Sequence, residues 1–146
     1  MKIEITPYHM ITFIYMGFAH LPDGEITKEE SDEIEQKVAR WMKVSYKNIN
    51  AYNDVVSQTS EWYNSMPDEE KVSTLLNMAA TLRKQEFMTE EHCKDLMSDL
   101  RDIAVADGRF GEKEKQLHDM VAKEFGINVL TAQEPKKRKS IGFKKS

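Results

Sequence analysis

The chain has 146 residues and a formal net charge of −4 at pH 7, with 40% hydrophobic and 32% charged residues. This composition is typical of one globular domain that buries a sizeable core. The single cysteine, Cys93, excludes an intramolecular disulfide framework and a cysteine-rich zinc cluster. The first residues lack the basic-then-apolar pattern of a secretory signal, and the apolar stretch 10–21 is too short to cross a membrane. We therefore expect a cytoplasmic protein.

Helical signals begin near the N-terminus. Thr6 is a favoured capping residue, and Pro7 is a favoured first residue of a helix. The residues that follow, through His20, are apolar on most sides, which predicts a central helix. A second helix is predicted after Thr27, because Thr27 and Glu30 form a capping box. Its inward stripe consists of Ile34, Val38, Trp41 and Met42.

The middle of the chain predicts two further amphipathic helices. One covers approximately residues 51–65, and the next opens at Pro67. Helical spacing places two sets of side chains in the core: Tyr52, Val55, Val56, Thr59 and Trp62 from the first helix, and Val72, Leu75, Leu76, Ala79 and Leu82 from the second.

The last two predicted helices have clear boundaries. Thr89 precedes two glutamates, which is typical of a helix start, and this fifth helix must stop near Gly108. The sixth begins around Glu112 and ends at Gly126, where Ile127 folds back as a hydrophobic partner. The inward stripes are Cys93, Leu96, Met97, Leu100, Ile103 and Ala104 in the fifth helix, and Leu117, Met120, Val121 and Phe125 in the sixth. Six helices with short connections predict an all-α, compact single-domain bundle.

The charge is divided unevenly along the chain. Residues 131–146 carry six basic residues and one acid, so the preceding residues carry a formal charge of −9. We therefore predict a helical domain over 1–130 and a basic, disordered tail over 131–146. The tail also fits an anionic membrane surface or a nucleic acid, through Lys136, Lys137, Arg138, Lys139, Lys144 and Lys145.

Two stretches between predicted helices nearly repeat each other. They are LPDGEITKEE, from Leu21 to Glu30, and VADGRFGEKE, from Val105 to Glu114. Each has an Asp-Gly pair, an apolar residue two positions after the glycine, and a glutamate seven positions after the aspartate. We call them the two Asp-Gly corners, and they indicate an internal pseudo-repeat of a helix–turn–helix unit.

One interpretation of the corners is purely structural. The glycine supplies a left-handed turn, and the aspartate binds nearby backbone amides. The glutamate occupies the third position of the next helix and accepts from its free amides. The apolar residue, Ile26 or Phe110, then fills the core beneath the corner.

The other interpretation is a weak cation site. A high-affinity calcium loop of the EF-hand type is excluded, because the first and third loop positions fall on apolar residues: Ala19 and Leu21, and Ile103 and Val105. Carboxylates with carbonyls and water would still suit a hard divalent cation such as Ca²⁺, Mg²⁺ or Mn²⁺. The candidate ligands are Asp23, Glu30, Asp107 and Glu114.

Other chemistry has little support in the sequence. There is no Gly-rich phosphate loop and no Gly-x-Ser-x-Gly motif, and the four histidines lack the spacing of a zinc site. Cys93 lies on an apolar stripe, where a core role is expected. These residues therefore give little support for an enzyme, and an unrecognised hydrolase is only the third hypothesis.

The corners resemble those of the TerB-like, tellurite-resistance family. The family pattern is Ala-x-Ala-Asp-Gly-x-apolar-x-x-x-Glu at the end of one helix and the start of the next, often present twice. The second corner matches it through Ala104, Ala106, Asp107, Gly108, Phe110 and Glu114. The first corner departs from it, because Ala19, Leu21 and Pro22 replace the regular run before Asp23.

The resemblance implies a bundle of about seven helices, so the expected number is six to seven. It also implies a non-enzymatic interaction module in a bacterial stress-response or defence assembly, bound to protein partners and cytoplasmic or peripheral to the inner membrane. Acidic corner residues of the family are associated with divalent metal, which implies a cation-binding sensor as the alternative function. The oligomeric state and the partner stay open.

Overall fold

The computed structural model describes residues 4–106, 108 and 110–127. Its six helices, in chain order, are α1 (Pro7–His20), α2 (Lys28–Trp41), α3 (Ile49–Asn64), α4 (Asp68–Arg83), α5 (Glu90–Val105) and α6 (Glu112–Phe125). No strand occurs in these residues, which confirms the all-α prediction. The six basic residues that we predict to meet lipid or nucleic acid lie outside the described part of the chain, so that expectation stays a prediction.

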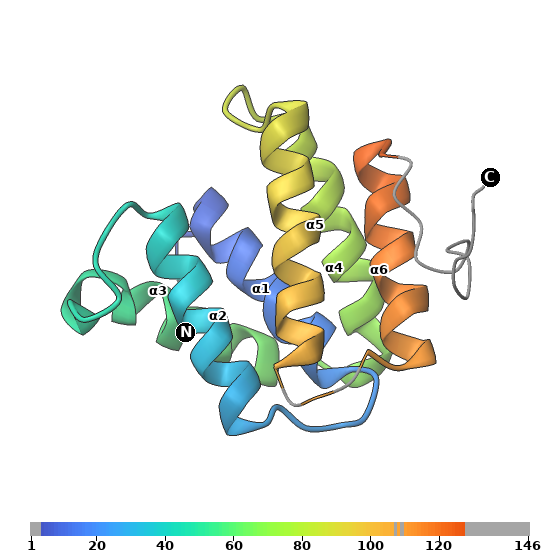
Figure 1. Cartoon of the computed structure of the whole chain (residues 1–146), viewed down its shortest axis with the longest axis horizontal. Coiled ribbons are helices and arrows are strands. Elements are labelled where there is room, and N and C mark those ends of the chain that lie inside the picture. Colours follow the sequence, from blue (N-terminus) through green and yellow to red (C-terminus); the bar gives the residue numbers. More distant parts are fainter. Residues whose placement is uncertain (1–3, 107, 109, 128–146) are drawn as a thin grey trace.

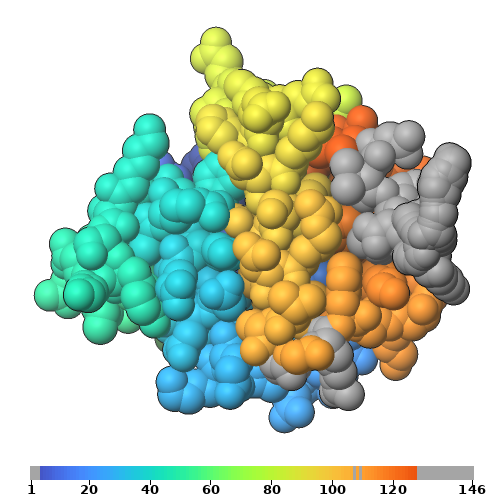
Figure 2. All heavy atoms as spheres, in the orientation of Figure 1, coloured from blue at the N-terminus to red at the C-terminus, as the bar shows by residue number. Residues whose placement is uncertain are grey.

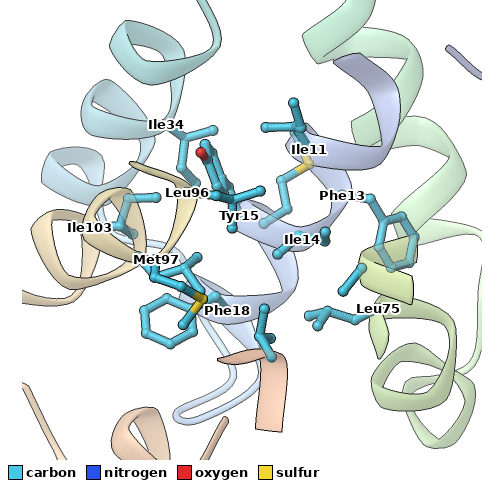
Figure 3. Close-up of a cluster of buried hydrophobic side chains, with 14 of the residues drawn as sticks. Ile11, Phe13, Ile14, Tyr15, Phe18, Ile34, Leu75, Leu96, Met97 and Ile103 are labelled. Atoms are coloured by element: carbon cyan, nitrogen blue, oxygen red, sulfur yellow. The ribbon is translucent and has the colours of Figure 1, made fainter. Parts of the chain in front are cut away.

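Helix α1 is the centre of the bundle, as its apolar sequence predicts. Residues 11–19 are all buried, and α1 contacts each of the other five helices. Figure 1 shows α1 behind α2 and α5, and Figure 3 shows its side chains between those of α5 and those of α4. Gly17 permits the close approach of α4, because a Cβ there would lie 2.6 Å from Leu75 Cδ1. A helix without a polar face is stable only when neighbours cover it on every side.

Local chemistry sets the predicted helix boundaries. The Thr6 and Thr27 side chains accept from the amides of His9 and Glu30, and Thr89 accepts from that of His92. Gly126 has φ +71° at the end of α6, and the Ile127 amide donates to the Ala122 carbonyl 2.9 Å away. These contacts satisfy backbone groups that a helix end leaves unpaired.

The structure corrects two predictions about side-chain placement. Met120 is 41% exposed, because the buried stripe of α6 passes through His118 and Ala122 instead. Ile26 is 37% exposed and does not fill the core beneath the first corner, where Leu21 packs instead. The predicted inward face of α3 is confirmed, because Tyr52 and Thr59 are buried and Val55, Val56 and Trp62 pack, partly buried, against the core.

Two methionines test the burial pattern of α5 and α6. Met97 is fully buried, so Met97→Ala should lower the free energy of unfolding by about 2–5 kcal/mol through lost burial and a cavity. Met120→Ala is the matched control and should change it by less than about 0.5 kcal/mol, as expected for a surface substitution. Urea denaturation measures both values. Equal losses in the two variants would contradict the α6 orientation described here.

Candidate functional site

The first Asp-Gly corner joins α1 to α2 and is held by local hydrogen bonds. The exposed Asp23 accepts from the Glu25 amide through Oδ1, at 3.2 Å, and Gly24 has φ +84°. Glu30 is fully buried, and its Oε1 accepts from the Thr27 amide at 2.9 Å. These contacts confirm the turn and capping roles that the sequence predicts.

The second corner joins α5 to α6 and repeats this arrangement. Gly108 has φ +100°, and Glu114, which is 7% exposed, accepts from the Gly111 amide through Oε1 at 2.6 Å. Phe110 packs against the core and against the ring of His118, as predicted for the apolar corner residue. Asp107, the fourth predicted metal ligand, lies outside the described residues.

The tertiary structure brings the two corners to the same end of the bundle. A pocket of about 250 Å³ is lined by Pro22, Asp23, Gly111, Glu112, Lys113 and Glu114. Asp23 and Glu114 therefore share one pocket, whereas Glu30 is buried within its own cap. Among the described residues, no group of three or more His, Cys, Asp or Glu is placed to hold a metal ion. The cation site thus stays a prediction.

Sequence reasoning missed a buried polar cluster around Asp99 of α5. The Asp99 side chain is 3% exposed and accepts two hydrogen bonds from Arg40 of α2, with Nη1 to Oδ1 at 2.9 Å and Nη2 to Oδ2 at 2.5 Å. Tyr15 of α1 donates to Oδ2 at 2.5 Å, and Trp41 Nε1 donates to the same oxygen at 2.9 Å. A buried carboxylate needs such compensation for its lost hydration. The sequence does contain a signal for this cluster, because helical spacing places Asp99 on the inward stripe between Leu96 and Ile103.

The Asp99 cluster ties three helices together and perturbs one tyrosine. Burial, followed by the nearby Asp99 charge, raises the pKa of the Tyr15 hydroxyl well above its usual value of 10.0. Tyr15 therefore keeps its proton and remains a donor to Asp99 at any physiological pH. The cluster holds α1, α2 and α5 in register, which fixes the relative position of the outer faces of α2 and α5.

A second buried polar network involves His118 of α6. Its Nε2 lies 3.0 Å from Arg101 Nη1, and its Nδ1 lies 3.0 Å from Asp119 Oδ1. Because a guanidinium can only donate, Nε2 must accept, and the neutral ring then donates from Nδ1 to Asp119. His118 thus joins α5 to α6 behind the second corner. The spacing of the histidines does not predict this contact, because Arg101 lies far from His118 along the chain.

A surface groove lies between α2 and α5, which lie side by side at the front of the molecule (Figures 1 and 2). It has a volume of about 470 Å³. We call it the α2–α5 groove, and its lining is Glu29, Asp32, Glu33 and Gln36 of α2 with Asp102, Val105 and Ala106 at the end of α5. Val105, at the C-terminal end of α5, is 52% exposed and presents an apolar side chain at the surface. The groove therefore combines four carboxylates with an exposed apolar contact point.

The alkaline pH dependence of stability tests the Asp99 cluster. An unfolded tyrosine loses its proton near pH 10, whereas Tyr15 keeps it in the folded state, so the Tyr15 contribution is constant below about pH 10 and is lost as the pH rises further. Tyr15→Phe should therefore make the fall in unfolding free energy between pH 9 and 11 shallower, as measured by urea denaturation. Tyr46, Tyr52, Tyr63 and Cys93, whose pKa values burial also raises, contribute to the remaining slope. An unchanged slope would contradict the buried hydrogen bond.

Comparison with known proteins adds one finding to this geometry. A family model described as "Tellurite resistance protein TerB" matches residues 19–134, which include the end of α1, all of α2–α6 and both Asp-Gly corners. No curated protein and no solved structure matches the chain. In the part of the chain that the structure describes, no helix is both long and apolar enough to cross a membrane. The match covers most of the sequence, and the chain belongs to the TerB tellurite-resistance family.

Proposed function

We propose that this chain is a non-enzymatic interaction module of a bacterial stress-response or defence assembly, and that the α2–α5 groove is its protein-binding surface. Family membership supports the association with tellurite and related stress. The single observation that carries the binding surface is the composition of the groove: Glu29, Asp32, Glu33 and Asp102 surround the exposed Val105. Such a surface suits a partner segment rich in lysine or arginine that also carries an apolar anchor.

The rigidity of the groove supports the same proposal. Lys37 bridges its two walls, with Nζ 3.0 Å from Asp102 Oδ2 and 3.5 Å from Glu33 Oε2. The half-exposed Arg40 and the buried Asp99 form a second bridge between α2 and α5. A preformed surface loses less conformational entropy on binding than a mobile one, so more of the contact energy appears as affinity.

Site-specific photo-crosslinking in cells tests the binding surface. A photoreactive residue in place of Val105 should yield crosslinked species heavier than the 17.0 kDa chain, whereas the same residue in place of the exposed Ile49 on α3 should not. The paired variant Glu29→Gln with Asp32→Asn should reduce the Val105 crosslink severalfold, because it removes two groove charges.

The matched control for that pair is Asp54→Asn with Glu61→Gln, which removes two exposed charges from α3 and should leave the crosslink unchanged. Crosslinks of equal yield at Ile49, or a Val105 crosslink insensitive to the groove charges, would refute the assignment of the surface.

A second candidate function is a weak divalent-cation sensor, favoured by the shared pocket that holds Asp23 and Glu114. Titration with Ca²⁺, Mg²⁺ or Mn²⁺ should then shift the amide signals of the corners at sub-millimolar concentration and leave those of α3 unchanged. Oxygen ligands of this type suit hard cations.

Conservative substitution at Glu114 separates the cation function from simple capping. Glu114→Gln keeps an acceptor for the Gly111 amide but removes the charge, whereas Glu114→Ala removes both. If the glutamate acts only as a cap, Glu114→Ala should cost about 1 kcal/mol or more of unfolding free energy, and Glu114→Gln clearly less. If the corners bind a cation, both variants should abolish the titration shifts, including the variant that keeps the cap.

A further inference from the structure

The α2–α5 groove keeps a net negative charge after its own ion pairs are counted. Two lysines neutralise part of this charge. Lys28 Nζ lies 3.0 Å from Asp32 Oδ2, and Lys37 forms ion pairs with both Glu33 and Asp102. Glu29 has no ion pair within the described part of the chain. Among the described residues, four carboxylates thus face two ammonium groups. A cationic segment would gain favourable electrostatic energy there, and Val105 offers it an apolar contact.

The sequence contains one segment with the complementary pattern. Residues 136–145 read KKRKSIGFKK, in which two groups of basic residues flank Ile141 and Phe143. This run combines six cations with two apolar anchors, which matches the mixture of carboxylates and exposed Val105 in the groove. The rest of the chain, at a formal charge of −10, offers no comparable basic run.

The described chain ends close enough for this segment to reach the groove. Phe125 and Ile127 line a pocket together with Glu90 and Cys93. The chain therefore leaves α6 close to the N-terminal end of α5. Val105 lies at the other end of α5, about 24 Å away at 1.5 Å per helical residue. The nine residues from Ile127 to Lys136 can span about 30 Å when extended. The connection therefore requires no rearrangement of the bundle.

We propose that residues 136–145 of this same chain dock in the α2–α5 groove and compete with its partner. The inference rests on the proposed function of the groove as a protein-binding surface. The intramolecular arrangement has the advantage of a high effective concentration, because a short connection keeps the segment near its site. A partner must then displace the segment, and any event that neutralises its lysines would expose the groove.

Paramagnetic relaxation in the isolated full-length chain tests the docking. A nitroxide at Ser140→Cys, in a Cys93→Ala background, should reduce the amide intensities of Asp32, Asp102 and Val105 by more than half at 50 mM salt. Amides of Asp54 and Glu61 on α3 should keep theirs. The reduction should disappear at 500 mM salt, where screening weakens exposed charge pairs. A mixed sample of labelled and isotope-enriched chains should show no effect, as expected for contact within one chain.

Two charge variants provide independent checks that leave the bundle folded. Glu29→Gln with Asp32→Asn should restore the groove signals, and so should replacement of Lys136, Lys137, Arg138 and Lys139 by Gln. Asp54→Asn with Glu61→Gln should not. Undiminished groove signals in the parent chain, salt-insensitive broadening, or an effect confined to the mixed sample would each overturn the proposal. Because the measurement uses no partner, its failure leaves the crosslinking test of the groove intact, and a failed crosslink leaves this result intact.

Discussion

The burial of α1 on every side is the constraint on which the rest of the structure depends. An isolated helix of this composition would expose apolar side chains in all directions, so the other five helices must surround it. The surrounding helices are amphipathic and contribute only one face each, which leaves their outer faces polar. Polar side chains in this bundle therefore lie mainly on its surface and at its corners, and only a few enter the core.

The polar groups that do enter the core connect neighbouring helices through hydrogen bonds. Asp99 receives donors from α1 and α2, and His118 joins α5 to α6 through Arg101. Neither contact adds much net stability by itself, because burying a charge costs hydration energy that its partners only offset. Their contribution is geometric, since directional hydrogen bonds fix how the helices are rotated and shifted against one another. This fixed arrangement of the helices determines the shape of the α2–α5 groove.

Carboxylates thus have three different environments in one small domain. Glu30 and Glu114 are buried as helix caps, Asp99 is buried as a connection between helices, and Glu29, Asp32, Glu33 and Asp102 face a groove. The first two environments give the carboxylates hydrogen-bond partners within the protein. The third keeps a surplus of negative charge at the surface, where a cationic partner can meet it. This division separates the buried corner carboxylates from the acidic surface that we propose as a docking site.

The sequence by itself determined the helices and their ends, because caps, glycine turns and apolar periodicity act over three or four residues. It also determined the roles of Asp23, Glu30 and Glu114 within their own corners, since each bonds to a backbone amide within three positions. Only the tertiary structure decided that the two corners share a pocket, that Asp99 meets Arg40 and Tyr15, and that acids of α2 lie beside Asp102. These contacts join residues separated by tens of positions, and their geometry depends on how the helices rotate around α1. For the same reason helical periodicity placed Met120 inside and the corner pattern placed Ile26 in the core, whereas packing left both exposed.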